Sequence, residues 1–437
     1  MKKLLALLLL AGCLTGCTSP MPASPEELLD APKLSDTQYQ VDRALREQMG
    51  QDIKLKYPQS GDYRSAFTFY DIDNDGADEA IVLHSYQSGG NAQITVMDQE
   101  NGQWQVEKTY PGLSPDIDFI RFEQLDSNPG KAMVIGWRPE GGQKIVAAYR
   151  YENREFTMLG SEDYTQLCID DFNRDGISEL LIVSAESDAR PTLIYMGEQE
   201  GLLDVLDSVN LDRQLVTFQT PVSGLISPGV YGAVLDVYNE RGNLCSIVVQ
   251  VEDGRLVLPL DDGDGVLFSS TIRSGGEASV FSQDVTGDGV IDIPTEWMPA
   301  GHEDLEDENR LLFTNYVNLG PGGFTTVMRA FVNPTEGYRL TLPDRWFSGE
   351  ETVTAVRQSG SAEVIFFLYS GDISDRSREL LRVQLVDLQS PPKQFDASAY
   401  FLLAKRGSFE YYARIPASDA AEYSVTQEEV LSLFQLL

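Results

Sequence analysis

A nine-residue acidic pattern that occurs three times constrains the fold of this chain more than any other feature. The copies read DIDNDGADE at 71–79, DFNRDGISE at 171–179 and DVTGDGVID at 284–292. Every copy has oxygen-bearing side chains at positions 1, 3, 5 and 9, and glycine at position 6. This spacing suits a hard cation such as Ca²⁺, because alternate residues of a tight loop point inward and glycine permits the sharp turn. The pattern therefore predicts three related cation-binding loops within a repeat.

We expect each copy to bind one Ca²⁺ ion, which stabilises its loop and performs no chemistry. The candidate ligands are Asp71, Asp73, Asp75 and Glu79 in the first copy, Asp171, Asn173, Asp175 and Glu179 in the second, and Asp284, Thr286, Asp288 and Asp292 in the third. The third copy should bind more weakly, because Thr286 offers only a hydroxyl or carbonyl oxygen. The alternative is three acidic turns that bind nothing, since Asp-Gly pairs are common in turns.

The loops do not fit the EF-hand, in which the twelfth residue is a bidentate Glu and a helix follows. The twelfth residues here are Val82, Ile182 and Thr295. The first two loops also continue into the apolar runs 80–83 and 180–183, which predict strands. A cation loop that lies between strands is the interpretation that remains.

The first two copies match the full motif D-x-[DN]-x-D-G-x-x-[DE]. With a carboxylate at the ninth position and a strand after it, the motif resembles the FG-GAP or VCBS repeat, the calcium loop of integrin-like β-propellers. The resemblance implies a calcium-bearing propeller. Propellers of this kind commonly serve as rigid interaction platforms, although a fold alone does not fix a function.

The spacing of the loops predicts further, degenerate units between them. The loops start at 71, 171 and 284, whereas a four-stranded blade usually takes about 40 to 50 residues. A charge-poor echo of the loop at 124–130 and an apolar strand at 231–238 mark the two intermediate units. We therefore predict a mainly β fold, with a β-propeller-like array of about five four-stranded blades over 63–332. The array is either five-bladed or incomplete.

After the repeats we expect a small α+β domain over 333–437, built from an antiparallel sheet and one terminal helix. Thr426 and Glu429 have the spacing of a capping box at the start of that helix. Phe434 and Leu437 continue its apolar face at helical spacing.

The N-terminus has the pattern of an export signal. A short basic region precedes the apolar run 4–11, which is too short to span a bilayer permanently. The pattern resembles a bacterial lipoprotein signal peptide, whose lipobox ends in a cysteine that becomes lipidated. We favour Cys17 as that residue, with Cys13 as the second choice. Residues 1–16 are then the signal peptide, and we expect an exported lipoprotein anchored on the outer face of the bacterial cytoplasmic membrane.

Two segments connect this anchor to the repeats. Residues 17–34 contain four prolines and predict a flexible tether. Residues 35–62 predict an N-terminal helix and a lead-in segment. Ser35 and Gln38 have capping-box spacing at the start of that helix.

The amino-acid composition mainly indicates which kinds of partner the protein can bind. The hydrophobic content of 42% supports a packed core, and the formal net charge is −35. That charge argues against nucleic-acid binding, because a phosphate backbone requires clusters of Lys and Arg. We expect membrane contact through the N-terminal lipid only, a monomeric state, and a protein or glycan partner at the cell surface.

No catalytic motif stands out in the sequence. The chain has only two histidines: we expect His84 to continue a strand and His302 to lie in an exposed loop. Cys168 and Cys245 predict two separate buried cysteines, with a long-range disulfide as the alternative.

Two functions follow from these observations. The favoured one is a non-catalytic, calcium-stabilised surface lipoprotein whose propeller is an interaction platform for a protein or glycan. The alternative is an extracellular polysaccharide hydrolase or lyase that uses carboxylates in the propeller cleft. A cluster of Arg or Lys, Asp or Glu, and Tyr around one pocket would favour the enzyme. An open, acid-lined face with ions only at the rim would favour the binding protein.

Overall fold

The computed structural model describes residues 34–437, except for 187–188, 260–268, 277–278, 307–308, 321, 359–360, 393–394 and 418–419. The predicted signal peptide and both candidate lipidation sites, Cys13 and Cys17, lie outside the described residues. Strands dominate the described part of the chain, where two α-helices occur. The expectation of a mainly β fold is confirmed. No helix among the described residues is both long and apolar enough to cross a membrane.

Between Ile53 and Val257 the chain forms four antiparallel sheets in succession, each built from consecutive strands. The first sheet contains β1 (Ile53–Leu55), β2 (Phe67–Tyr70), β3 (Glu79–Tyr86), β4 (Gln93–Glu100) and β5 (Gln103–Pro111). The second contains β6 (Asp116–Glu123), β7 (Ala132–Arg138), β8 (Lys144–Glu152) and β9 (Glu155–Tyr164). The third contains β10 (Gln166–Asp170), β11 (Glu179–Ser184), β12 (Thr192–Gln199) and β13 (Leu202–Asn210). The fourth contains β14 (Leu215–Phe218), β15 (Val222–Ser227), β16 (Val230–Asn239), β17 (Leu244–Glu252) and β18 (Arg255–Val257).

Two further five-stranded sheets complete the fold. The fifth contains β19 (Ile293–Trp297), β20 (Phe313–Gly320), β21 (Gly323–Asn333), β22 (Tyr338–Thr341) and β28 (Phe434–Leu436). The sixth contains β23 (Val353–Arg357), β24 (Glu363–Leu368), β25 (Glu379–Asp387), β26 (Phe401–Arg406) and β27 (Phe409–Arg414). Short 3₁₀ turns occur at Ser269–Thr271, Asp344–Trp346 and Ala397–Ala399.

The hairpin that closes each of the first four sheets uses the same turn chemistry. Two consecutive residues with positive φ connect the strands, the geometry of the tight hairpin turns that match strand twist. The pairs are Asn101-Gly102, Asn153-Arg154, Glu200-Gly201 and Asp253-Gly254. This turn therefore recurs at the same place, the last hairpin, in each of the four sheets.

The hydrophobic core is divided into clusters that lie between consecutive sheets. Strand β7 shows how: Ile135 and Trp137 pack against Ile81 and Leu83 of the first sheet, whereas Val134 packs towards the third sheet. A strand buried on both faces reads as a continuous apolar run, which explains the apolar sequence of β7. Similar clusters join the third to the fourth sheet, the fourth to the fifth and the fifth to the sixth.

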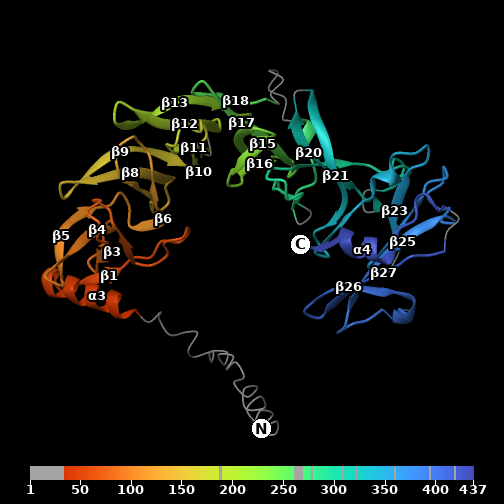
Figure 1. Ribbon diagram of the computed structural model, residues 1–437, viewed down its shortest axis with the longest axis horizontal. Coiled ribbons are helices and arrows are strands. Elements are labelled where there is room, and N and C mark those ends of the chain that lie inside the picture. The colour runs from red at the N-terminus through yellow and green to blue at the C-terminus, as the bar shows by residue number, and fades with distance from the viewer. Residues whose placement is uncertain are drawn as a thin grey trace, which may run out of the picture.

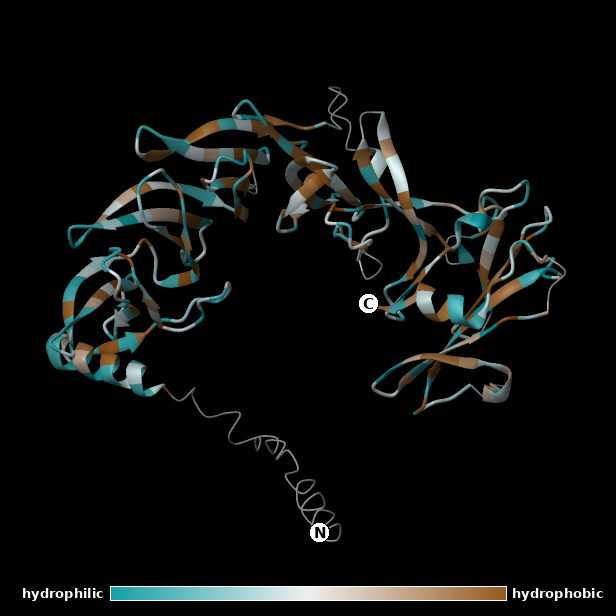
Figure 2. Cartoon of the chain, viewed as in Figure 1, coloured by the Kyte–Doolittle hydropathy of each residue, from teal (hydrophilic) through white to brown (hydrophobic). Residues whose placement is uncertain are grey.

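The sheets follow one another along an open arc, with α3 at one end and the sixth sheet at the other (Figure 1). Figure 2 shows hydrophobic residues on the strands and hydrophilic ones at many of the turns. Helix α3 (Asp36–Met49) begins with the predicted capping box of Ser35 and Gln38. Its Val41 and Leu45 are buried against the outer face of the first sheet. This packing covers a sheet face that would otherwise be exposed at the end of the arc.

The C-terminal segment differs from expectation in two ways. Thr426 caps α4 (Gln427–Leu433) as predicted, but the helix ends at Leu433. Phe434 and its neighbours form β28, which pairs with β22 in the fifth sheet. In addition, β21 pairs with β22, so the fifth sheet extends across position 333, where we expected one domain to give way to the next.

Candidate metal-binding loops

The first acidic loop joins β2 to β3 and is closed by its own carboxylates. The two oxygens of Asp71 accept hydrogen bonds from the backbone of Asp75 and Gly76, each at 3.1 Å. Asp73 accepts a second bond from the Asp75 amide, also at 3.1 Å. Asn74 and Gly76 have φ of 61° and 95°, a conformation that Gly and Asn adopt most readily. The loop is therefore folded by residues within the nine-residue pattern.

Glu79, at the ninth position, is buried where β3 begins, with 1% of its surface exposed. Its Oε2 accepts a hydrogen bond of 2.9 Å from the backbone of Ile72, but Oε1 is buried without a partner in the described structure. Burial raises the pKa of Glu79 to about 7, and the nearby carboxylates, Asp73 first among them, add to the rise. A buried carboxylate oxygen of this kind is costly unless a cation or a donor meets it.

Ligand oxygens of Asp71, Asp73 and Glu79 lie within 4.8 Å of one another. These three carboxylates could hold a metal ion. Glu79 also has an unpartnered buried oxygen, Oε1, and all of the donors in the group are oxygens. The residues present therefore fit a hard cation.

The second acidic loop, between β10 and β11, repeats this geometry. Asp171 accepts from the backbone of Asp175 and Gly176, each at 3.0 Å, and Glu179 accepts from Phe172 at 2.9 Å. Burial is the main cause that raises the pKa of Glu179 to about 7. Asp171, Asp175 and Glu179 form the second carboxylate group that could hold a metal ion.

The third acidic loop, before β19, is hydrogen-bonded differently. Oδ2 of Asp292 accepts from the backbone of Val285 and Thr286 and from the Thr286 hydroxyl, at 2.9 to 3.1 Å. We expected Thr286 and Asp292 to bind the same ion, but the Thr286 hydroxyl donates a hydrogen bond to the Asp292 carboxylate instead. The amide nitrogen of Asn318, once correctly oriented, also donates to Asp292 Oδ1 at 2.7 Å. Both oxygens of Asp292 are already satisfied by the protein.

The degenerate loop of the second unit contains a cation of its own. The degenerate loop lies between the paired residues Glu123 and Ala132. It has the same length as the first acidic loop, which lies between the paired residues Tyr70 and Glu79. The buried Arg150 donates from its guanidinium to Asp126 at 2.6 Å and to two backbone carbonyls of the loop. An arginine of the protein therefore occupies the loop here, where three carboxylates gather in each of the first and second acidic loops.

One position, in strands β4, β8, β12 and β20, distinguishes these loops, and the nine-residue pattern does not contain it. The position directly follows Met97, Tyr149, Met196 and Val317. Each of these four residues pairs with the second residue after the eight-residue loop, or its equivalent, on the neighbouring strand β3, β7, β11 or β19. The residues at this position are Asp98, Arg150, Gly197 and Asn318. Asp98 contributes to the raised pKa of Glu79, Arg150 fills the degenerate loop and Asn318 donates to Asp292. Only an alignment of the hairpins could have revealed this position from sequence.

The loops also connect neighbouring units along one edge of the arc. Each link joins a loop to a neighbouring unit through a backbone hydrogen bond, a side-chain amide or a guanidinium stacked on a ring. The links are Asn74 Nδ2 to the Pro129 carbonyl at 3.5 Å, the Ser178 amide to the Gln124 carbonyl at 2.7 Å, the Arg174 guanidinium on the Tyr231 ring at 3.9 Å, and the Ile291 amide to the Leu225 carbonyl at 2.7 Å. A bound ion that orders a loop would therefore also order the contact between two units.

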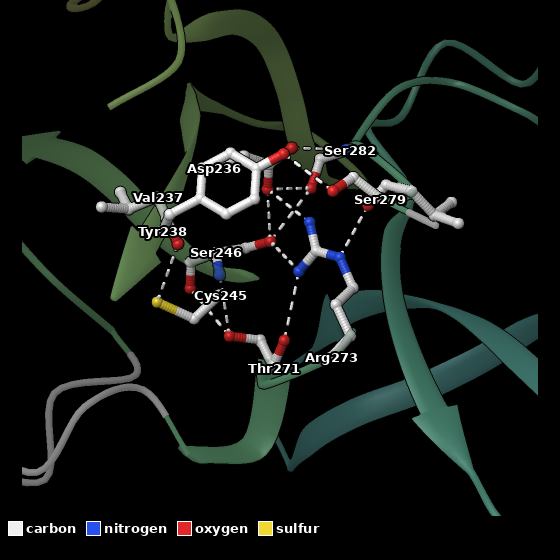
Figure 3. Close-up of polar contacts among 10 residues, drawn as sticks. Asp236, Val237, Tyr238, Cys245, Ser246, Thr271, Arg273, Ser279 and Ser282 are labelled. Atoms are coloured by element: carbon white, nitrogen blue, oxygen red, sulfur yellow. Dashed lines mark hydrogen bonds and ion pairs between the residues drawn. The ribbon is translucent and has the colours of Figure 1, made fainter. Parts of the chain in front are cut away.

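A second polar cluster, formed by Asp236, Ser246, Arg273 and Ser282, is buried between the fourth and fifth sheets (Figure 3). Arg273 donates to Asp236 at 2.8 Å and to the Ser246 hydroxyl at 2.9 Å. Ser282 donates to both oxygens of Asp236, at 2.7 and 2.9 Å. The cluster ties the segment that precedes β19 to the fourth sheet. Its carboxylate is fully paired and buried, which is the arrangement of a structural ion pair.

The two histidines are both buried. His84 lies in β3 as expected, with its Nε2 2.8 Å from the Thr95 hydroxyl. The expectation that His302 is exposed was wrong: its Nδ1 accepts from the Leu311 amide and its Nε2 faces the Ala355 carbonyl at 2.8 Å. The Ala355 contact joins His302 to β23 of the sixth sheet. Cys168 and Cys245 are both free thiols, as expected, but only Cys245 is buried; Cys168 is half-buried, which corrects the expectation of two buried cysteines.

Comparisons with known proteins add little to this picture. No family model matches the chain, and no curated protein matches it. Among solved structures it is similar to a hypothetical protein from Leishmania major, at 13% identity and a TM-score of 0.23, covering 63% of this chain and 89% of that one. A likeness of that size bears on neither the fold nor the function of this chain.

Proposed function

We propose that this protein is a non-catalytic, calcium-stabilised surface lipoprotein whose sheets form an incomplete β-propeller that acts as an interaction platform for a protein or glycan. The observation that carries the proposal is the pair of matching loops in the first and third units. Each gathers three carboxylates within 4.8 Å of one another, and the first holds a buried carboxylate oxygen without a partner.

Calcium is the cation that these loops suit best. The donors are carboxylate oxygens, with an amide oxygen available from Asn173. Ca²⁺ accepts many oxygen ligands in flexible geometry, whereas Mg²⁺ demands a near-ideal octahedron and retains its waters. When bound, the ion would supply a cationic partner for the buried carboxylates of Glu79 and Glu179, and so would stabilise the folded loops.

The arrangement of sheets supports a platform. Each sheet packs face to face on the next through its own hydrophobic cluster, which is how radially repeated blades protect their strands. Helix α3 covers the outer face of the first sheet, and the sixth sheet packs on the fifth. An array whose ends are covered in this way does not need to close into a ring.

One observation favours the polysaccharide hydrolase or lyase as a second candidate. Asp118, Lys144, Arg138 and Tyr164 surround a single pocket. However, the Tyr164 hydroxyl already donates to Asp118 at 2.7 Å, and burial, followed by that carboxylate, raises the pKa of Tyr164 further above its ordinary value. Asp118 also accepts from both cations. Because neither the Tyr164 hydroxyl nor the Asp118 carboxylate is available as a base, we favour binding over catalysis.

The test of the calcium proposal is thermal unfolding of the soluble part of the protein, in chelator and in millimolar Ca²⁺. With a Kd of about 10⁻⁴ M, a hundredfold excess of Ca²⁺ would add about 2.7 kcal/mol of stability per site. The double variant Glu79→Gln/Glu179→Gln keeps an oxygen that can accept from Ile72 and Phe172 but removes both charges. It should remain folded in chelator and lose most of the calcium response.

Glu140→Gln, at an exposed turn outside the loops, is the matched control and should respond to Ca²⁺ as the wild type does. Two outcomes would overturn the proposal. One is a wild-type protein whose unfolding temperature does not change with Ca²⁺. The other is a double variant that gains as much stability from Ca²⁺ as the wild type does.

A further inference from the structure

A pocket of about 480 Å³ opens between the second and third sheets. Its walls come mainly from β6, the first strand of the second sheet, and β10, the first strand of the third. Both strands lie on the concave side of the arc (Figure 1). A pocket of this volume is in the range of small-ligand sites, and none of the candidate calcium ligands lines it.

The pocket is built around the buried side chain of Asp118. Arg138 donates to Oδ1 of Asp118 at 3.0 Å, and Lys144 and Tyr164 donate to Oδ2 at 2.8 and 2.7 Å. Burial by itself would raise the pKa of Asp118, but the bonds from Lys144 and Tyr164 and the charge of Arg138 lower it below its ordinary value. The carboxylate therefore stays charged and fixes both cations at the wall of the pocket.

The pocket carries an excess of positive charge that Asp118 does not neutralise. Arg121, Arg138 and Lys144 all line it, and their side chains are 45%, 42% and 31% exposed, against 8% for Asp118. Glu123 offsets one more charge, through an ion pair with Arg121 at 2.6 Å. The Nε of Arg138 is buried without a partner in the described structure. In a chain with a net charge of −35, this is a place where an anion would be attracted.

An extended peptide cannot pair with β6 as an added strand in this pocket. The edge of β6 is already occupied there, because the amides of Gln59 and Ser60 donate to the carbonyls of Ile117 and Asp118 at 3.2 and 2.8 Å. Strand addition requires a free sheet edge. The pocket therefore suits a compact anionic group carried by a small unit.

We propose that this pocket binds the carboxylate of a uronic acid residue in an acidic glycan. Arg121 and Arg138 present guanidinium groups, which pair with carboxylates in planar geometry, and Lys144 adds a third donor. Gln166 and Thr220 also line the pocket. The Thr220 hydroxyl donates to the Gln166 amide oxygen at 3.0 Å and the Gln166 amide nitrogen donates to the Phe218 carbonyl at 2.9 Å, which leaves the second amide hydrogen and the hydroxyl oxygen for the sugar hydroxyls. The inference rests on the proposed function, because it names a glycan as the partner of the platform.

The experiment is calorimetric titration of the calcium-loaded protein with digalacturonate, neutral galactobiose and a Glu-Glu dipeptide. Digalacturonate should bind, galactobiose should not, and the affinity for digalacturonate should fall as salt is raised, because the cations are half exposed. Arg121→Gln and Arg138→Gln should each weaken binding about tenfold or more. Asp118 keeps at least two of its donors in either variant, so the fold should be preserved.

Arg43→Gln is the matched control, because Arg43 also forms one surface ion pair but lies on α3, outside the pocket. It should leave digalacturonate binding unchanged. The titration is repeated in chelator, where binding in the pocket should persist. Equal binding of galactobiose, tighter binding of the dipeptide, or digalacturonate binding that requires Ca²⁺ and ignores Arg121→Gln would overturn the inference. The calcium-dependent unfolding described above is independent of all these outcomes, so the proposed function can stand when this inference fails.

Discussion

The guanidinium of Arg150 lies 2.6 Å from the carboxylate of Asp126, inside the loop of the second unit. The same place in the first unit gathers the carboxylates of Asp71, Asp73 and Glu79. A covalently attached cation therefore replaces, in one repeat, the free ion that the neighbouring repeats are suited to hold. Because Arg150 is part of the chain, the second unit needs no ion to neutralise its loop.

Replacing Arg150 should destabilise the protein by an amount that does not depend on calcium. Arg150→Met leaves the buried Asp126 carboxylate without its cation, at a cost of about 3 to 5 kcal/mol. Denaturant unfolding in chelator and in Ca²⁺ measures the loss, which should be equal in both. The double variant Arg150→Met/Asp126→Leu should recover part of the stability, since the unpaired charge is removed as well. A loss that appears only in chelator would contradict a role for Arg150 as a built-in cation.

Replacing Arg273 should likewise destabilise the packing between the fourth and fifth sheets. Arg273→Met removes the cation from a carboxylate, Asp236, that is 5% exposed, and we expect a loss of about 3 to 5 kcal/mol. The control is Arg43→Met, which breaks an exposed pair on α3 and should cost less than about 1 kcal/mol. Comparable losses in the two variants, measured by denaturant unfolding, would show that the buried cluster is not a structural ion pair.

Acid should destabilise the fold partly through His84. Burial, with a smaller contribution from Arg46, lowers the pKa of His84 from 6.5 to about 4. The unfolded chain therefore takes up this proton at a higher pH than the folded chain does. The stabilising contribution is complete above pH 6.5 and decreases as the pH falls from there towards 4, by about 3 kcal/mol at most.

Nuclear magnetic resonance can follow this titration directly, because the chain has only two histidines. The ring signals of His84 should not shift until the pH is well below 6. In unfolding experiments, His84→Gln should show a weaker dependence on pH between 6.5 and 4 than the wild type. A His84 ring that titrates near 6.5 in the folded protein would contradict the burial described here.

Local features of the fold could be predicted because they depend on residues a few positions apart. The capping box of Ser35 and Gln38, the Asn101-Gly102 turn and the closed shape of the acidic loops are all set by short-range hydrogen bonds and by φ preferences. The same local reasoning failed at Phe434. Its apolar spacing is compatible with a helix, but pairing with β22 places it in a strand.

What the sequence by itself determined is the repeat, its strand-forming runs and the identity of the carboxylates in each loop. The tertiary structure alone decided which residue faces each loop, Asp98, Arg150, Gly197 or Asn318, because strand register brings together side chains that lie far apart in the chain. It also gathered Asp118, Arg138, Lys144 and Tyr164 around one pocket, and buried His302. Contacts of this kind arise from the collective burial of whole sheets, which no short stretch of sequence specifies.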